Sequence, residues 1–151
     1  MRSAKIYFHY ATSGFSFTNR KRLKHFLQEL FNEEGKKIDT VNYIFCSDEE
    51  LLAINIKYLG HDFYTDTITF EFSETNQRLF ADVYISIERV KENSKEFKFS
   101  FNDELHRVIF HSSLHLCGYK DKLKHQVLQM RNKEEDYLNQ YFVSRGTRYK
   151  H

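Results

Sequence analysis

Residues 111–121 read H-S-S-L-H-L-C-G-Y-K-D, and the rest of the chain is organised around them. They follow residues 101–110, in which apolar side chains recur at helical spacing. This periodicity predicts a helix that continues into the stretch. His111 and His115 would then lie on one helical face about one turn apart, where both imidazoles can bind one metal ion.

Gly118 is the expected end of this helix, because glycine readily adopts the left-handed conformation found after a helix C-terminus. The chain can then turn back and supply a third ligand, for which Asp121 is the nearest candidate and His125 the second. A fourth position on such an ion would hold water, as in catalytic rather than structural sites. The histidine spacing alone is equally compatible with a partly buried structural pair.

The remaining segments predict a single α+β domain over residues 1–151. We expect a small mixed β-sheet of about four strands packed with about five helices, with the metal site on the helix that carries H-x-x-x-H. Strands are expected at residues 5–10, 40–46, 67–72 and 79–87, and helices at residues 19–32, 48–58, 88–95, 101–116 and 124–141. Thr18 is a plausible N-cap, and Ser47 with Glu50 forms a capping-box pattern. The sequence leaves open whether residues 145–151 form a flexible tail.

The two cysteines, Cys46 and Cys117, have no C-x-x-C spacing, so they are interpreted as buried free thiols in a reducing compartment. There is no apolar N-terminal region and no long apolar run, which argues against a secretory signal and a membrane span. We therefore expect a cytoplasmic protein.

Charge is distributed unevenly along the chain, although the net charge is only +2. Residues 119–151 hold eight Lys and Arg against four Asp and Glu, whereas residues 1–118 hold 15 against 17. Positive charge around and after the histidine stretch would attract a polyanion. A solvated helix face followed by a basic tail explains the same pattern.

A second basic cluster lies in the first turns of the helix expected at residues 19–32. It contains Arg20, Lys21, Arg22 and Lys24. Positive charge at a helix N-terminus opposes the helix dipole, so these side chains favour a role other than helix stability. The RNA backbone is one candidate partner.

The histidine stretch resembles the signature H-G-x-L-H-L-x-G-Y-D-H of the YbeY family, bacterial metal-dependent endoribonucleases that act in ribosomal RNA maturation. Residues 55–70, with N-x-x-Y-x-x-H-D-x-x-T-D-x-I-T-F, are similar to the family pattern N-x-x-Y-R-x-K-D-x-P-T-D-V-L-S-F. Residues 81–86, A-D-V-Y-I-S, resemble its G-D-I-x-I-S strand. The three segments occur in the family's order.

The resemblance implies one zinc ion per chain, bound by His111, His115 and Asp121. The family has a third histidine where this chain has Asp121. A carboxylate is an acceptable zinc ligand, and it also suits harder cations, so the identity of the ion stays open. A zinc protease is a weaker interpretation, because that motif needs Glu where Ser112 stands.

The function implied is metal-dependent hydrolysis of single-stranded RNA in ribosomal RNA maturation and ribosome quality control. Precursor ribosomal RNA and the small ribosomal subunit are the expected partners, and neither a membrane nor DNA is expected. Cationic side chains would balance the charge that develops at phosphorus. The candidates for this role are His61, Lys120 and Lys122, with Arg107 ranked lower as a helix-surface residue. The RNA-binding candidates are Arg20, Lys21, Lys24 and Lys57.

Two departures bear on activity. The family arginine after the tyrosine is Leu59 here, and the usual proline is Tyr64. A missing arginine favours a second hypothesis, a ribosome-associated RNA-binding factor with a structural metal and little catalysis. A third hypothesis is a metal-dependent hydrolase of a small molecule.

Two acidic residues have structural interpretations. Asp66 is expected to cap a turn, and Asp82 to bond a loop or the outer nitrogen of a histidine.

Overall fold

A computed structural model describes residues 5–12, 14–74 and 77–142 of the chain. In chain order its elements are β1 (Lys5–Tyr10), α1 (Arg20–Glu33), β2 (Ile38–Cys46), α2 (Asp48–Ile54), the π-helical turn η1 (Asn55–Leu59), β3 (Thr67–Glu71), β4 (Leu79–Ser86), α3 (Ile87–Phe97), α4 (Phe101–Leu116) and α5 (Lys124–Tyr141). The expected α+β class, with four strands and five α-helices, is confirmed.

The four strands form one mixed sheet in the order β1-β2-β4-β3. β1 and β4 both run parallel to β2, and β3 pairs antiparallel with β4 at the edge. Side chains alternate between the two faces, as the two-residue period of a strand requires. In β4, for example, Leu79, Ala81, Val83 and Ile85 are buried, whereas Phe80 is exposed.

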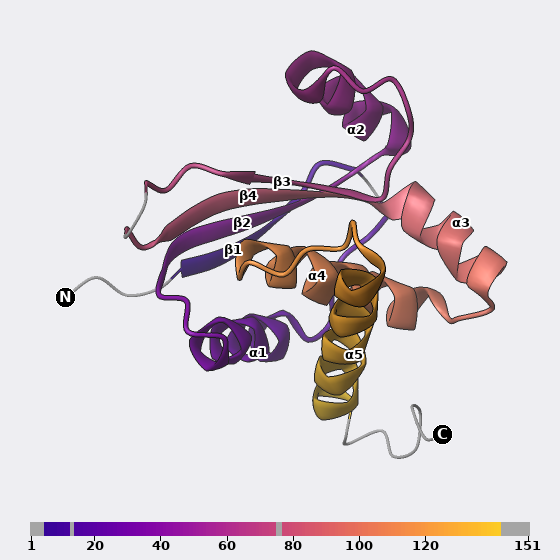
Figure 1. Cartoon of the computed structure of the whole chain (residues 1–151). Helices are drawn as coiled ribbons and strands as arrows, with labels where there is room; N and C mark the ends of the chain where they lie inside the picture. Colours follow the sequence, from indigo (N-terminus) through magenta and orange to yellow (C-terminus); the bar gives the residue numbers. More distant parts are fainter. Residues whose placement is uncertain (1–4, 13, 75–76, 143–151) are drawn as a thin grey trace.

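The helices lie unequally on the two faces of the sheet. Figure 1 shows α1, α4 and α5 together on one face, with α2 on the other side, above the strands. The main core lies between the sheet and the α1, α4 and α5 layer. A smaller cluster of Cys46, Leu51 and Ile68 lies under α2.

Aromatic rings make up much of the main core, in a chain with an aromatic content of 17%. The Phe45 ring is surrounded by those of Phe8, Tyr10, Phe15 and Phe17, with centroids 5.3–5.8 Å away. Most of these pairs are tilted or edge-to-face, which is the arrangement that the ring quadrupole favours.

Two hydroxyl contacts fix the rotation of α4 against the sheet. The buried Tyr43 on β2 hydrogen-bonds Ser113 with an Oη–Oγ distance of 2.6 Å. Ser112 hydrogen-bonds Thr67 on β3 with an Oγ–Oγ1 distance of 2.8 Å. Because both serines face the sheet, His111 is turned toward the other side of the helix.

Element boundaries agree with expectation except in a few places. Asn19, not Thr18, is the N-cap of α1, and it makes no side-chain cap bond. The capping box of Ser47 and Glu50 is formed, but α2 ends early and continues as the π-helical turn η1, which ends at Gly60 in the left-handed conformation. β2 begins two residues before the expected start.

Three further expectations concern thiols, membrane and tail. Cys46 and Cys117 are free thiols as expected, but only Cys46 is fully buried and Cys117 is half-buried. Burial raises the pKa of each thiol to about 12. Among the described helices, none has the length and apolar character needed to cross a membrane. Residues 145–151, for which the sequence left flexibility open, lie outside the described residues.

We predict that Ser113→Ala destabilises the fold more than Tyr43→Phe. Tyr43→Phe removes one hydrogen bond, at about 1 kcal/mol, because Ser113 still donates to the Ile109 carbonyl oxygen. Ser113→Ala instead leaves the buried Tyr43 hydroxyl without that partner, at about 1–3 kcal/mol. Urea unfolding measures both, and equal losses of unfolding free energy would contradict this account of α4.

Candidate metal centre

The centre is built on the C-terminal half of α4. Ser100 caps the start of this helix by accepting a hydrogen bond from the Asp103 N–H, 3.1 Å away. At the other end Gly118 has φ 102°, in the left-handed region predicted for it. The Tyr119 N–H donates back to the Leu114 carbonyl oxygen, which reverses the chain. The loop that follows therefore returns along α4 and carries Asp121 to the two histidines.

Three ligand atoms converge at this point, as the sequence predicts. The Nε2 atoms of His111 and His115 are 3.1 Å apart, and Asp121 Oδ2 lies 3.3 Å from each of them. Tetrahedral ligands at about 2.0 Å from a zinc ion are about 3.3 Å from one another. The donor spacing therefore fits a small ion with two imidazoles and one carboxylate.

The outer nitrogens of both histidines donate hydrogen bonds. His111 Nδ1 donates to Glu134 Oε2 at 2.5 Å, and His115 Nδ1 donates to the Tyr119 carbonyl oxygen at 2.9 Å. Because a carboxylate oxygen and a carbonyl oxygen are hydrogen-bond acceptors, each imidazole in its neutral form has its lone pair on Nε2. Two lone pairs and a carboxylate oxygen then face one another, an arrangement that a cation stabilises.

Glu134 links the centre to a buried charge network. Its side chain is only 4% exposed, and its second oxygen accepts a hydrogen bond from Arg107 Nη1 at 3.0 Å. Arg107 also binds Glu104, with Nη2 2.6 Å from Oε2. Arg107 is half-buried, with 27% of its side chain exposed, and two carboxylates hold it, so the expectation that it is a free residue of the helix surface is wrong.

The surroundings of His111 favour a positive charge there. Burial alone would lower the pKa of this imidazole, but the hydrogen bond and charge of Glu134, together with the charge of Asp121, outweigh burial and raise it. The same negative field favours a bound metal ion.

Glu134 was not predicted from the sequence, although the sequence contains a signal for it. On α5 it lies on the stripe of buried residues formed by Met130, Tyr137 and Tyr141. A carboxylate on an otherwise apolar face needs a partner. Asp82, the residue expected to orient a histidine, instead accepts a hydrogen bond from the side-chain amide of Asn42, with Nδ2 3.1 Å from Oδ1.

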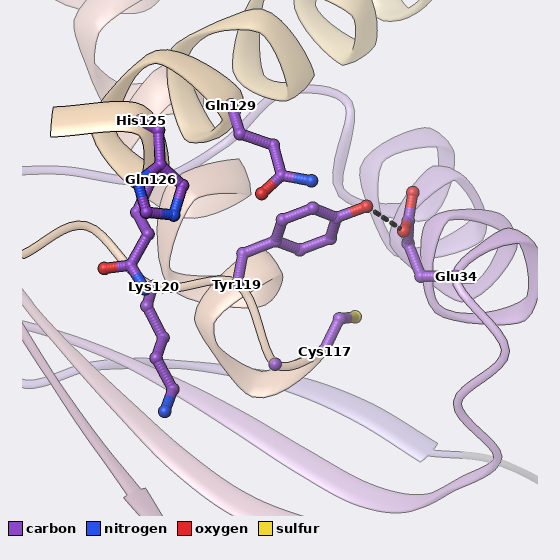
Figure 2. A pocket seen from close by; sticks show the side chains of 8 residues that line it. Glu34, Cys117, Tyr119, Lys120, His125, Gln126 and Gln129 are labelled. Carbon is purple, nitrogen blue, oxygen red and sulfur yellow. Dashed lines mark hydrogen bonds between the residues drawn. The ribbon is translucent and has the colours of Figure 1, made fainter. Parts of the chain in front are cut away.

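The second histidine is positioned through an anchored tyrosine. The Tyr119 hydroxyl donates to Glu34 Oε1 at 2.7 Å, and Tyr137 and Lys133 bind the other oxygen of the same carboxylate. Burial would raise the pKa of Glu34, but these hydroxyl and ammonium partners lower it overall. Figure 2 shows Tyr119 reaching across to Glu34 from the loop after α4. Glu34 thereby holds the loop whose carbonyl oxygen orients His115.

A polar cavity of about 400 Å³ lies beside this tyrosine. His125 and Lys120 both line it, and the Lys120 side chain extends away from Tyr119 and Glu34 (Figure 2). His125, the second candidate for the third ligand, is not part of the donor cluster, which takes Asp121.

The cationic candidates lie in two loops. Lys120 and Lys122 are exposed and flank Asp121 in the loop after α4. His61 is exposed beyond η1, where its ring stacks on Phe63 with centroids 5.1 Å apart.

The RNA-binding candidates lie on α1 and η1. Arg20 and Lys21 are exposed on the first turn of α1. Lys24 places Nζ 5.3 Å from the centroid of the Phe8 ring, and Lys57 places Nζ 5.2 Å from that of Tyr58. Within the described part of the chain, no hydrogen bond or ion pair connects these cations, or His61, to the donor cluster. Their roles stay predictions.

Comparison with known proteins agrees with this geometry. The family model "Endoribonuclease YbeY" matches residues 8–142. The chain is 41% identical over 138 residues to endoribonuclease YbeY of Flavobacterium johnsoniae, covering 91% of this chain and 98% of that protein. It is also 41% identical over 139 residues to endoribonuclease YbeY of Cytophaga hutchinsonii, covering 92% and 97%. A Thermotoga maritima protein solved in solution has a TM-score of 0.64 at 26% identity, covering 93% of this chain and 90% of that one.

We predict that Glu134→Gln weakens metal binding by about 10- to 100-fold, the usual effect of removing a carboxylate that orients a ligating histidine. Competition with a chromophoric chelator measures the affinity, and circular dichroism checks that the variant is folded. Asp136→Asn is the matched control, because Asp136 is an exposed acidic residue on the same helix. Equal affinities of a folded Glu134→Gln variant and of the control would contradict the role of Glu134.

Proposed function

This chain belongs to the YbeY endoribonuclease family, and we propose that it hydrolyses phosphodiester bonds of single-stranded RNA at a divalent ion held by His111, His115 and Asp121. The observation that carries the proposal is the convergence of two Nε2 atoms and one carboxylate oxygen at 3.1–3.3 Å, with both Nδ1 atoms already engaged as donors. The membership rests on the family match over residues 8–142 and on relatives at 41% identity.

Zinc is the ion we propose, one per chain. Two imidazoles and one carboxylate form a donor set used by hydrolytic zinc sites, and they leave room for a non-protein ligand. When bound, such an ion supplies activation of a water molecule and polarisation of a phosphoryl oxygen. The protein holds the donors in place through Glu134 at His111 and through Tyr119 at His115.

Cationic side chains would stabilise the charge that develops on the scissile phosphate. We assign this role to Lys120 and Lys122, which flank Asp121, and to His61. His61 lies two residues after Leu59, the residue that replaces the family arginine. Arg107 is excluded from this role, because Glu104 and Glu134 already neutralise it. Arg20, Lys21, Lys24 and Lys57 are proposed to contact the RNA backbone.

The proposed setting is ribosomal RNA maturation and ribosome quality control in the cytoplasm, with precursor ribosomal RNA and the small ribosomal subunit as partners. Support comes from relatives named endoribonuclease YbeY, with which this chain aligns over nearly their whole length. Leu59 in place of the family arginine supports the second candidate, an RNA-binding factor whose ion is structural.

We predict that His115→Ala folds normally but loses both the bound ion and RNA cleavage. His9→Ala is the control, because His9 is an exposed histidine of β1 whose bond is to Asn42. Metal content is measured on protein purified without chelator or affinity tag, and cleavage is followed on a single-stranded oligonucleotide with and without chelation.

Each outcome of this experiment decides between the hypotheses. About one ion per chain, with cleavage abolished by chelation and by His115→Ala, supports the hydrolase. An ion bound without cleavage supports the RNA-binding factor. A chain that binds no ion under any condition would overturn the metal centre.

A further inference from the structure

A second cavity adjoins the metal centre through Glu134. It has a volume of about 560 Å³ and lies between the end of α3, the turn that follows it, α4 and α5. Glu134 and Arg107 both line it, and Glu134 is also the residue that binds His111. The volume is within the range of about 300–1,000 Å³ typical of small-ligand sites.

We propose that this cavity binds one nucleobase of the RNA strand whose backbone lies at the metal centre. The proposal rests on the proposed function and deepens it by adding a base-binding subsite. Three features of the cavity support it, namely its exposed aromatic rings, the conformation of the turn that presents them, and its distribution of charge.

Two phenylalanine rings at the cavity are exposed. Phe97 and Phe99 both line it, and each remains 51% exposed. Exposed large apolar side chains that line one cavity are typical of interaction surfaces rather than of core. A nucleobase is a suitable partner, because single-stranded RNA is commonly held by stacking of its bases on aromatic rings.

The residue between the two rings has a constrained backbone. Lys98 has φ 61° and is the non-glycine residue with positive φ within the described part of the chain. It occupies the C-cap of α3, a position where glycine would reach the same conformation without a steric penalty. The Phe99 N–H donates to the Ser94 carbonyl oxygen, 2.9 Å away, so the turn that carries the two rings is held in one conformation.

Charge in the cavity favours a neutral base over an anion. The interior includes the carboxylates of Asp66, Glu134 and Glu135, which would repel a phosphate. Asp66 accepts a hydrogen bond from Asn93, with Nδ2 3.3 Å from Oδ2, so this side offers polar groups to the edge of a base.

A phosphate beside the base would meet a different side chain. Arg131 lines the cavity from the exposed side of α5, and within residues 5–12, 14–74 and 77–142 it forms no hydrogen bond or ion pair. Arg107 is held by two carboxylates and is not available for this contact.

The test measures binding of a fluorescein-labelled eight-nucleotide single-stranded RNA to the full-length chain by fluorescence anisotropy. The measurement is made at low temperature, and the oligonucleotide is checked for integrity. We expect Phe97→Ala and Phe99→Ala each to weaken binding by about 5- to 100-fold, as removal of a base–aromatic stack does. Phe99→Leu, which keeps an apolar side chain but removes the ring, should also bind weakly. Arg131→Gln should reduce the slope of log affinity against log salt by about 0.7.

Phe72→Ala is the matched control. Phe72 is 54% exposed at the end of β3, where its ring contacts Phe80 rather than the cavity. Its replacement should leave RNA affinity within twofold of wild type. Equal effects of Phe72→Ala and Phe99→Ala, or unchanged binding by folded Phe97 and Phe99 variants, would overturn the base-binding subsite alone. A wild-type chain that binds no RNA would overturn the proposed function together with the subsite.

Discussion

The burial of one face of α4 beneath the sheet is the constraint on which the rest of the structure depends. Ser112 and Ser113 face the strands, where Thr67 and Tyr43 satisfy their hydroxyl groups. A helix whose rotation is fixed in this way must direct His111, and His115 one turn later, away from the sheet. The loop after Gly118 and the helix α5 then pack over that outward side and supply Asp121 and Glu134.

The charges around the centre form one connected set rather than independent pairs. Glu104, Arg107 and Glu134 are linked by hydrogen bonds of 2.6–3.0 Å, and Glu134 ends the series at His111. A buried carboxylate without partners would be strongly destabilising, whereas each carboxylate here is bound by a cation or an imidazole. The same contacts that satisfy Glu134 therefore fix the orientation of the His111 ring, so stability and ligand geometry depend on one network.

Local sequence patterns were sufficient to predict the main helices and strands and the three converging ligands. Periodicity placed the helix carrying His111, Gly118 marked its end, and Asp121 followed within reach of the same face. Contacts between distant segments were not predictable in this way. Asp82 was expected to orient a histidine, but it accepts a hydrogen bond from Asn42 on the neighbouring strand. Glu134 reaches His111 only because α5 packs across α4. The surface assignment of Arg107 failed for the same reason, since helical spacing does not reveal which helix covers a residue.

X-ray absorption at the zinc edge of the metal-loaded protein tests the central claim most directly, because it reports the atoms bound to the ion. The account predicts nitrogen and oxygen ligands at about 2.0–2.1 Å, outer-shell scattering from two imidazole rings, and no sulfur at about 2.3 Å. A sulfur ligand, or a spectrum without imidazole scattering, would contradict an ion held by His111, His115 and Asp121.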